Sequence, residues 1–75
     1  MKNLSQLQKG QSAIIHSFTD KDMALKLMEM GCTPGETVCL NQIAPMGDPI
    51  AITVSGYLLS LRKEEAATIM ISFGS

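Results

Sequence analysis

The stretch LMEMGCTPGETVCL, from Leu27 to Leu40, contains the signals that decide the fold. Its apolar residues change from helical spacing to strict alternation within a few positions, and Gly31, Pro34 and Gly35 lie at the change. A glycine with left-handed backbone commonly ends a helix, and a Pro-Gly pair suits the two central positions of a type II turn. The stretch therefore predicts a helix that ends at Gly31 and reverses at once into a strand.

A helix is predicted upstream because Met23, Leu27 and Met30 recur at helical spacing. The segment Thr19–Asp22 precedes them and offers an N-cap side chain for the first free amides. Such an apolar stripe normally faces the core, so we expect the helix to pack with this face over one end of the sheet. As an alternative, Met28 points outward and forms a soft, adaptable patch for a partner.

Alternating apolar residues predict five short strands, at 12–18, 37–41, 50–55, 57–61 and 69–73. Residues 4–7 predict a short helical turn, and so do residues 63–67. The two prolines of the loop around Gly47 cannot donate to a sheet, and Gly56 marks a further turn. We expect a mainly β protein: a small five-stranded barrel with one α-helix between the first and second strands and a short helical turn before the last. Closure would remove the exposed sheet edges.

Length and composition predict a single domain, spanning 1–75, with an aliphatic core. The chain is 45% hydrophobic and 17% charged, contains no Trp, and has a net charge of −1. A nucleic-acid-binding protein is expected to carry a basic stripe, and the six cations form none, so we expect no nucleic-acid partner. The N-terminus shows no signal peptide, and no apolar stretch is long enough to span a membrane. We therefore expect a cytoplasmic protein without direct membrane insertion.

Reactive groups are scarce, which argues against an enzyme. The chain has no phosphate-binding loop of the nucleotide hydrolases. His16 is its single histidine, and Cys32 and Cys39 lie seven positions apart, so they do not form the close pairs of a structural zinc site. We expect no cofactor and no built metal site. The alternative hypothesis is a metal-responsive domain that binds Fe²⁺ or another divalent ion weakly through His16 and carboxylates.

Three segments in register, LMEMGCTPGETV, APMGDPIAI and GYLLSLRKEEA, resemble the FeoA family, small cytoplasmic components of bacterial ferrous iron uptake. The resemblance covers Leu4 to Ile71. It implies an SH3-like β-barrel, and a partner, the membrane transporter FeoB with its cytoplasmic GTPase domain. The function it implies is an accessory, regulatory one. Residues of the family pattern that we assign to structure are Gly31, Pro34, Gly35, Pro45, Gly47, Pro49, Gly56 and Ser60.

Five residues are predicted to contact a partner: Met28, Met46, Asp48, Tyr57 and Arg62. Met46 lies at the tip of a surface loop, where binding residues are common on rigid folds. Asp48 has a second interpretation as a cap for nearby amides. The planar guanidinium of Arg62 suits a carboxylate, either within the fold or on a partner. Tyr57 alone cannot line the aromatic groove that binds proline-rich peptides. A homo-oligomer remains open as a further possibility.

Overall fold

The computed structural model describes residues 2–73, so the first residue and the last two of the expected 1–75 domain lie outside the described part. Its elements follow in chain order: β1 (Lys2–Asn3), the 3₁₀ turn η1 (Leu4–Gln6), β2 (Ser12–Phe18), α1 (Lys21–Glu29), β3 (Thr37–Ile43), β4 (Ile50–Val54), β5 (Tyr57–Leu61), α2 (Lys63–Ala66) and β6 (Ile69–Ser72). The mainly β prediction and the places of both helices are confirmed. A strand as short as β1 cannot show alternation, so the sequence did not predict it.

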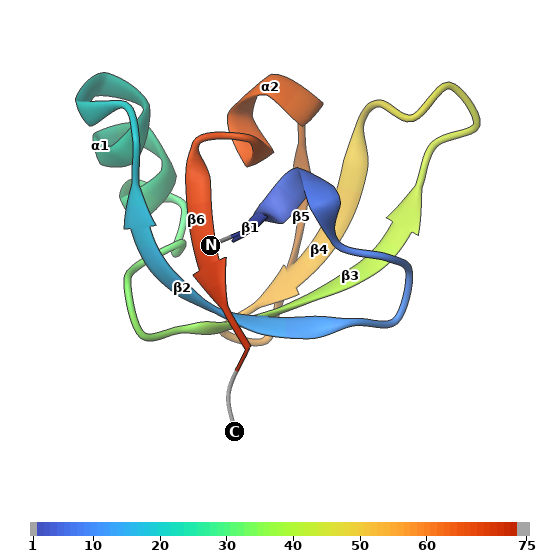
Figure 1. Cartoon of the computed structure of the whole chain (residues 1–75), viewed down its shortest axis with the longest axis horizontal. Helices are drawn as coiled ribbons and strands as arrows, with labels where there is room; N and C mark the ends of the chain where they lie inside the picture. The colour runs from blue at the N-terminus through green and yellow to red at the C-terminus, as the bar shows by residue number, and fades with distance from the viewer. Residues whose placement is uncertain (1, 74–75) are drawn as a thin grey trace.

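The strands form one antiparallel sheet in the order β1-β6-β2-β3-β4-β5. The sheet curls strongly, with α1 and α2 at one end of the molecule (Figure 1). Strands β1 and β5 are the two ends of this order, and no pairing joins them within residues 2–73. The expected closed barrel is therefore wrong in this respect: the curled sheet stays open, and β5 keeps a free edge.

The core is aliphatic, as the composition predicts. Its members come from the sheet, from η1, from both helices and from the segments that follow η1 and α1, and all are apolar: Leu4, Leu7, Ala13, Ile15, Leu27, Cys32, Val38, Leu40, Ile50, Ile52, Val54, Leu61, Ala66, Ile69 and Ile71. Strand β4 shows the clearest alternation, with three buried residues separated by half-buried ones. Met23 of α1 and Met30, the C-cap residue of this helix, are partly buried and pack against this cluster. The predicted inward stripe of α1 is confirmed.

Both ends of α1 are fixed by the residues that the sequence indicated. At its start, Asp20 Oδ1 accepts from the backbone N–H groups of Asp22 (3.0 Å) and Met23 (3.1 Å). At its end Gly31 has φ +103°, and the amide of Cys32 donates to the carbonyl of Leu27 (2.9 Å). This bond, together with one from the Gly31 amide, forms a Schellman motif.

Two turns fold the sheet as predicted. Gly35 has φ +94°, and the amide of Glu36 donates to the carbonyl of Thr33 (3.1 Å), which gives the type II turn before β3. Ser55 and Gly56 both have positive φ, so they form a two-residue type I′ turn between β4 and β5. The Ser55 hydroxyl also donates to Glu36 Oε2 (2.7 Å) and joins the two turns.

Candidate functional site

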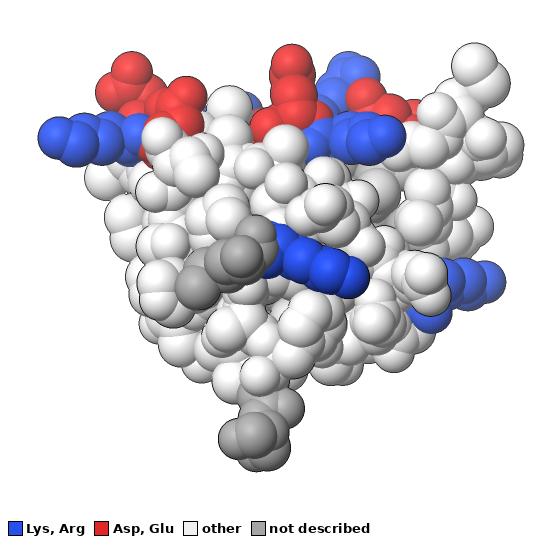
Figure 2. Space-filling view, viewed as in Figure 1, with Lys and Arg blue, Asp and Glu red and all other residues white. Residues whose placement is uncertain are grey.

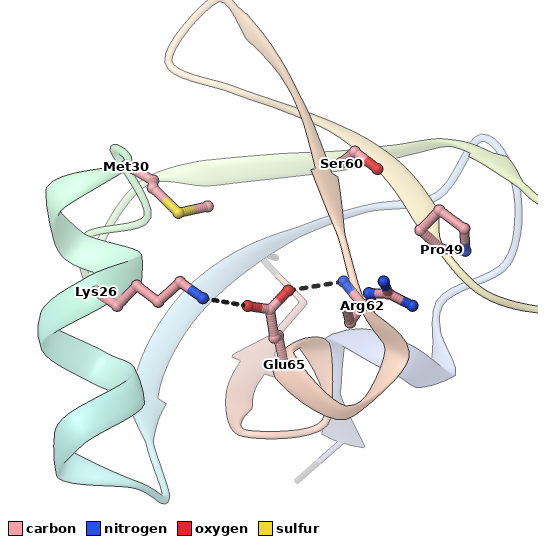
Figure 3. Close-up of a pocket in the computed structure, with 6 residues that line it drawn as sticks. All are labelled: Lys26, Met30, Pro49, Ser60, Arg62 and Glu65. Atoms are coloured by element: carbon pink, nitrogen blue, oxygen red, sulfur yellow. Dashed lines mark hydrogen bonds and ion pairs between the residues drawn. The ribbon is translucent and has the colours of Figure 1, made fainter.

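A groove of about 490 Å³ lies where β5, α1 and α2 meet. Its lining residues come from three parts of the chain: Lys26, Met30, Pro49, Ser60, Arg62 and Glu65. We call it the α1–β5 groove. Figure 3 shows Lys26 and Met30 of α1 on one side, Ser60 and Arg62 on the other, and the Glu65 carboxylate between them. The groove therefore combines apolar walls with three charged side chains.

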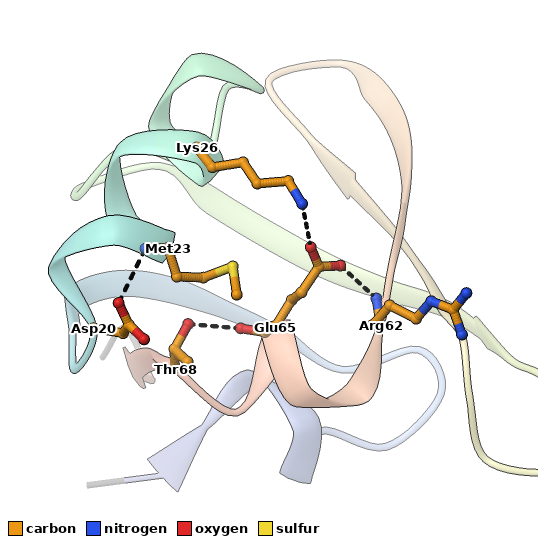
Figure 4. A network of polar contacts seen from close by, with 6 residues as sticks. All are labelled: Asp20, Met23, Lys26, Arg62, Glu65 and Thr68. Atoms are coloured by element: carbon orange, nitrogen blue, oxygen red, sulfur yellow. Dashed lines mark hydrogen bonds and ion pairs between the residues drawn. The ribbon is translucent and has the colours of Figure 1, made fainter.

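Glu65 organises the polar side of the α1–β5 groove. Its Oε2 accepts from Lys26 Nζ at 3.0 Å, and its Oε1 accepts from the backbone N–H of Arg62 at 2.8 Å (Figure 4). The Lys26 side chain is 61% exposed whereas that of Glu65 is only 12% exposed. The bond to the Arg62 amide, and secondarily the one to Lys26, hold the pKa of Glu65 below its ordinary value. Glu65 thereby caps α2 and ties α2 to α1.

The lowered pKa of Glu65 predicts a stability that falls in acid. The unfolded chain takes up the proton near the usual glutamate pKa of about 4.3, before the folded protein does. The contribution of Glu65 is therefore present above that pH and lost as the pH falls through the lower folded pKa. We expect Glu65→Gln to flatten the dependence of the free energy of unfolding on pH between 3 and 6, measured by urea denaturation at each pH.

Glu64→Gln is the matched control for this prediction. Glu64 is the neighbouring residue on α2 and is exposed. It forms no ion pair with any of residues 2–73. The control is expected to keep the pH dependence of the wild type, and equal flattening by both variants would contradict the role given to Glu65.

Arg62 brings a guanidinium group to the groove that is not used within the fold. It forms no ion pair with an acidic side chain of residues 2–73, and Figure 3 shows it pointing away from Glu65, to the side of Pro49. The sequence left two partners open for Arg62, a carboxylate within the fold or a carboxylate on another protein. The first of these ion pairs is absent from the described residues. The external contact stays a prediction.

Asp48 acts inside the fold. Its Oδ1 accepts from the backbone N–H of Lys63 at 2.9 Å, so it anchors the 44–49 loop to the first turn of α2. The interpretation of Asp48 as a cap for a nearby amide is confirmed, and Gly47, with φ +85°, shows the turn geometry expected of it. A contact of Asp48 with a partner stays a prediction.

A second, more apolar hollow of about 250 Å³ adjoins the groove. Its lining comes from β3, β4, β5 and the loop between β3 and β4: Gln42, Ala44, Pro45, Pro49, Ile50, Ala51 and Ser60. Pro49 and Ser60 line both depressions. These two residues and Pro45 were assigned to structure from the sequence, and the structure places them at the candidate site as well.

The other predicted contact residues are exposed but lie apart from the groove lining. Met46 is 92% exposed at the tip of the 44–49 loop, and Met28 and Tyr57 are exposed on α1 and at the start of β5. None of the three lines the α1–β5 groove or the adjoining hollow. The structure therefore brings together Arg62, Ser60 and Pro49. The side chains of Met28, Met46 and Tyr57 are exposed at other places on the surface.

His16 lies on the exposed face of β2, where its Nδ1 is 2.9 Å from the Ser17 hydroxyl. Cys32 is buried and Cys39 is half-buried, and both are free thiols. Burial raises the pKa of the Cys32 thiol. Within residues 2–73 no three side chains of His, Cys, Asp or Glu are grouped as they would be around a metal ion. Weak binding of Fe²⁺ at His16 remains an untested prediction.

Lys26, Met30 and Glu65 are groove residues that the sequence did not reveal. Lys26 and Glu65 lie on different helices, yet their side chains are in contact across 39 positions of sequence. A signal was present, because Glu65 follows Arg62 at the spacing of a capping box. No local pattern identified Lys26 as its partner.

Charged side chains concentrate at the end of the molecule where the groove lies. Figure 2 shows Lys, Arg, Asp and Glu gathered over α1 and α2, while the lower part of this face is mostly uncharged. Positively and negatively charged side chains are interspersed there. The surface can therefore form polar contacts, but it has no strong electrostatic field of one sign. None of the helices described in residues 2–73 has the length and apolar character needed to cross a bilayer.

The sequence profile of the FeoA domain matches residues 2–72. The chain belongs to the FeoA domain family. The resemblance read from the sequence is thus confirmed, and the match covers every element from β1 to β6.

Named relatives of this FeoA domain include separate proteins and a fusion. An Fe(2+) transport protein A/Fe(2+) transporter FeoB fusion protein of Porphyromonas gingivalis is 36% identical over 69 residues, which are 91% of this chain. The chain spans 8% of the length of that fusion protein. A FeoA-like protein of Clostridium acetobutylicum, solved by NMR, is 33% identical with a TM-score of 0.89, and covers 96% of this chain and 85% of its own.

A third relative has a solved structure whose fold is named. The crystal structure of Stenotrophomonas maltophilia FeoA, complexed with zinc and described as a prokaryotic SH3 domain protein, is 27% identical with a TM-score of 0.82. The alignment covers 96% of this chain and 91% of that one. The expected SH3-like fold is thus confirmed, although the sheet itself is open at β1 and β5.

Proposed function

We propose that this FeoA domain is an accessory protein of ferrous iron uptake that binds the cytoplasmic part of the FeoB transporter and modulates its transport. The fusion relative carries the proposal, because a chain that joins the two modules keeps them within reach of each other. The S. maltophilia relative supports it as well, since that protein is described in relation to ferrous iron transport activation. With this function, the chain acts in the cytoplasm as a single domain.

The surface of the domain suits binding better than catalysis. The aliphatic core supports a charged groove, an apolar hollow and an exposed loop tip. Binding residues are often carried by loops and clefts on such a frame. We infer a protein-binding module, with the GTPase side of the transporter as the proposed contact.

Titration of the isolated cytoplasmic domain of FeoB from the same organism into the folded chain tests this proposal. We expect saturable binding at micromolar concentrations, with a change in the rate of GTP hydrolysis or nucleotide release on the transporter domain. Calorimetry measures the affinity, and a phosphate-release assay measures the modulation. No binding at tens of micromolar, with the chain shown to be folded by circular dichroism, would overturn the proposal.

A further inference from the structure

We propose that the α1–β5 groove binds an extended peptide segment that adds to the free edge of β5 as a strand and places a carboxylate on Arg62. The inference rests on the proposed function and deepens it, because it names the surface and the kind of partner segment. Strand addition to a sheet edge is a general mode of peptide recognition, in which main-chain hydrogen bonds supply affinity and side chains supply specificity.

The free edge follows from the register of the β4–β5 hairpin. The two-residue turn makes Val54 and Tyr57 a hydrogen-bonded pair, and this pattern repeats at every second position, so that Ile52 bonds with Leu59. The residues in between, Leu58 and Ser60, direct their N–H and C=O groups away from β4. Within residues 2–73 no further strand pairs with β5 on that side. Two donors and two acceptors are therefore aligned there for an incoming strand.

The groove includes the space between this unpaired side of β5 and α1, and it offers room for one segment. Its lining includes Ser60 from β5 and Met30 at the end of α1, and at its other side Pro49, the residue that precedes β4. Figure 3 shows α1 forming the wall opposite β5. Its volume of about 490 Å³ is within the range of sites that hold small ligands. A short extended segment fits between β5 and α1 better than the edge of a whole second sheet.

The charges select an acidic segment. Lys26 is neutralised by Glu65 at 3.0 Å, and Glu65 is the acidic residue among those that line the groove. Of the two cations that line the groove, Arg62 is therefore the one without an ion-pair partner in residues 2–73. A guanidinium fork binds carboxylates in a bidentate manner with good geometry.

The spacing along β5 predicts a pattern for the segment. Successive strand residues point to opposite faces, so Leu58, Ser60 and Arg62 point to the outer face together. Leu58 is 70% exposed and lies four positions before Arg62, whose backbone is still extended. An added strand places one side chain beside each of them. We expect an aliphatic residue and an Asp or Glu four positions apart in the bound segment.

Overlapping nonapeptides that cover the cytoplasmic sequence of FeoB from the same organism are the probe. Each is titrated into the ¹⁵N-labelled chain, and amide shifts and amide exchange are followed by NMR. We expect a peptide with the aliphatic and acidic residues at this spacing to bind, to shift the amides of Leu58 and Ser60, and to slow their exchange. Arg62→Gln is expected to weaken that binding about ten- to a hundredfold, the effect of losing a charge-assisted bidentate contact.

Lys63→Gln is the matched control, because Lys63 is the adjacent exposed cation and does not line the groove. It is expected to change the affinity by less than about twofold. Leu58→Lys, which introduces a charge on the sheet edge, is a second test and is expected to weaken binding while the spectrum of the folded chain is retained.

Four outcomes would overturn the groove proposal. The amide shifts are confined to the outer face of α1, or the peptide affinity is unchanged by Arg62→Gln. Alternatively, the slowing of amide exchange in β5 depends only on the concentration of the chain itself, or none of the peptides binds. If the peptides fail while the intact FeoB domain binds, the groove proposal is wrong and the proposed function stands. If the intact domain fails as well, both are wrong.

Discussion

Leu61→Ala is expected to leave the domain largely unfolded at room temperature. Leu61 is fully buried at the end of β5, where it belongs to the aliphatic core. Truncation of a buried leucine removes its transfer free energy and leaves a cavity, at a cost of about 2–5 kcal/mol. A single core of this size supplies roughly 3–5 kcal/mol in total. Circular dichroism and urea denaturation measure the loss.

Leu58→Ala provides the matched control on the same strand. It removes the same atoms three positions away, but Leu58 is exposed, so the free energy of unfolding is expected to change by less than about 0.5 kcal/mol. Similar losses from the two variants would mean that β5 does not direct Leu61 into the core as the structure has it.

Gly31→Ala is expected to lower the free energy of unfolding by about 1–2 kcal/mol, the cost of a left-handed backbone for a residue with a Cβ. Gly31 has φ +103° at the end of α1. A Cβ added there would meet no atom within 4 Å, so the cost comes from the backbone conformation and not from a clash. Thermal and urea denaturation of the variant measure it.

D-alanine at position 31, introduced by chemical synthesis, separates the two causes. Its mirror-image side chain accepts positive φ, so we expect stability equal to that of the wild type, or a gain of about 0.4–1 kcal/mol from a less flexible unfolded chain. Equal destabilisation by the L and D residues would contradict the left-handed helix end.

Local signals determined most of the fold in advance. Asp20 caps α1, and Gly31 ends it in a Schellman motif. Pro34 and Gly35 turn the chain into β3 as their types require. In each case the deciding residues lie within about five positions of one another, so the physics is visible in a short window of sequence. The alternation of β4 is equally local and predicted its buried face.

The failures were non-local. Closure of the barrel depends on whether β5 meets β1. These two strands lie far apart in the sequence and at opposite ends of the sheet order, and no alternation pattern reports the distance between them. The pair between Lys26 and Glu65 spans 39 positions of sequence, and no short window of sequence contains both residues. Arg62 was identified from the chemistry of its guanidinium group. That it forms no ion pair within the described residues depends on three-dimensional packing, which the sequence alone does not show.

The pairing of β1 with β6 has a consequence for longer proteins built from this domain. Lys2 lies opposite Ile71, and its ammonium group is 5.9 Å from the centre of the Phe73 ring. The two ends of the described part of the chain, residues 2 and 73, therefore lie beside each other. Gene fusions in the two possible orders would then present the module to a neighbour in a similar pose.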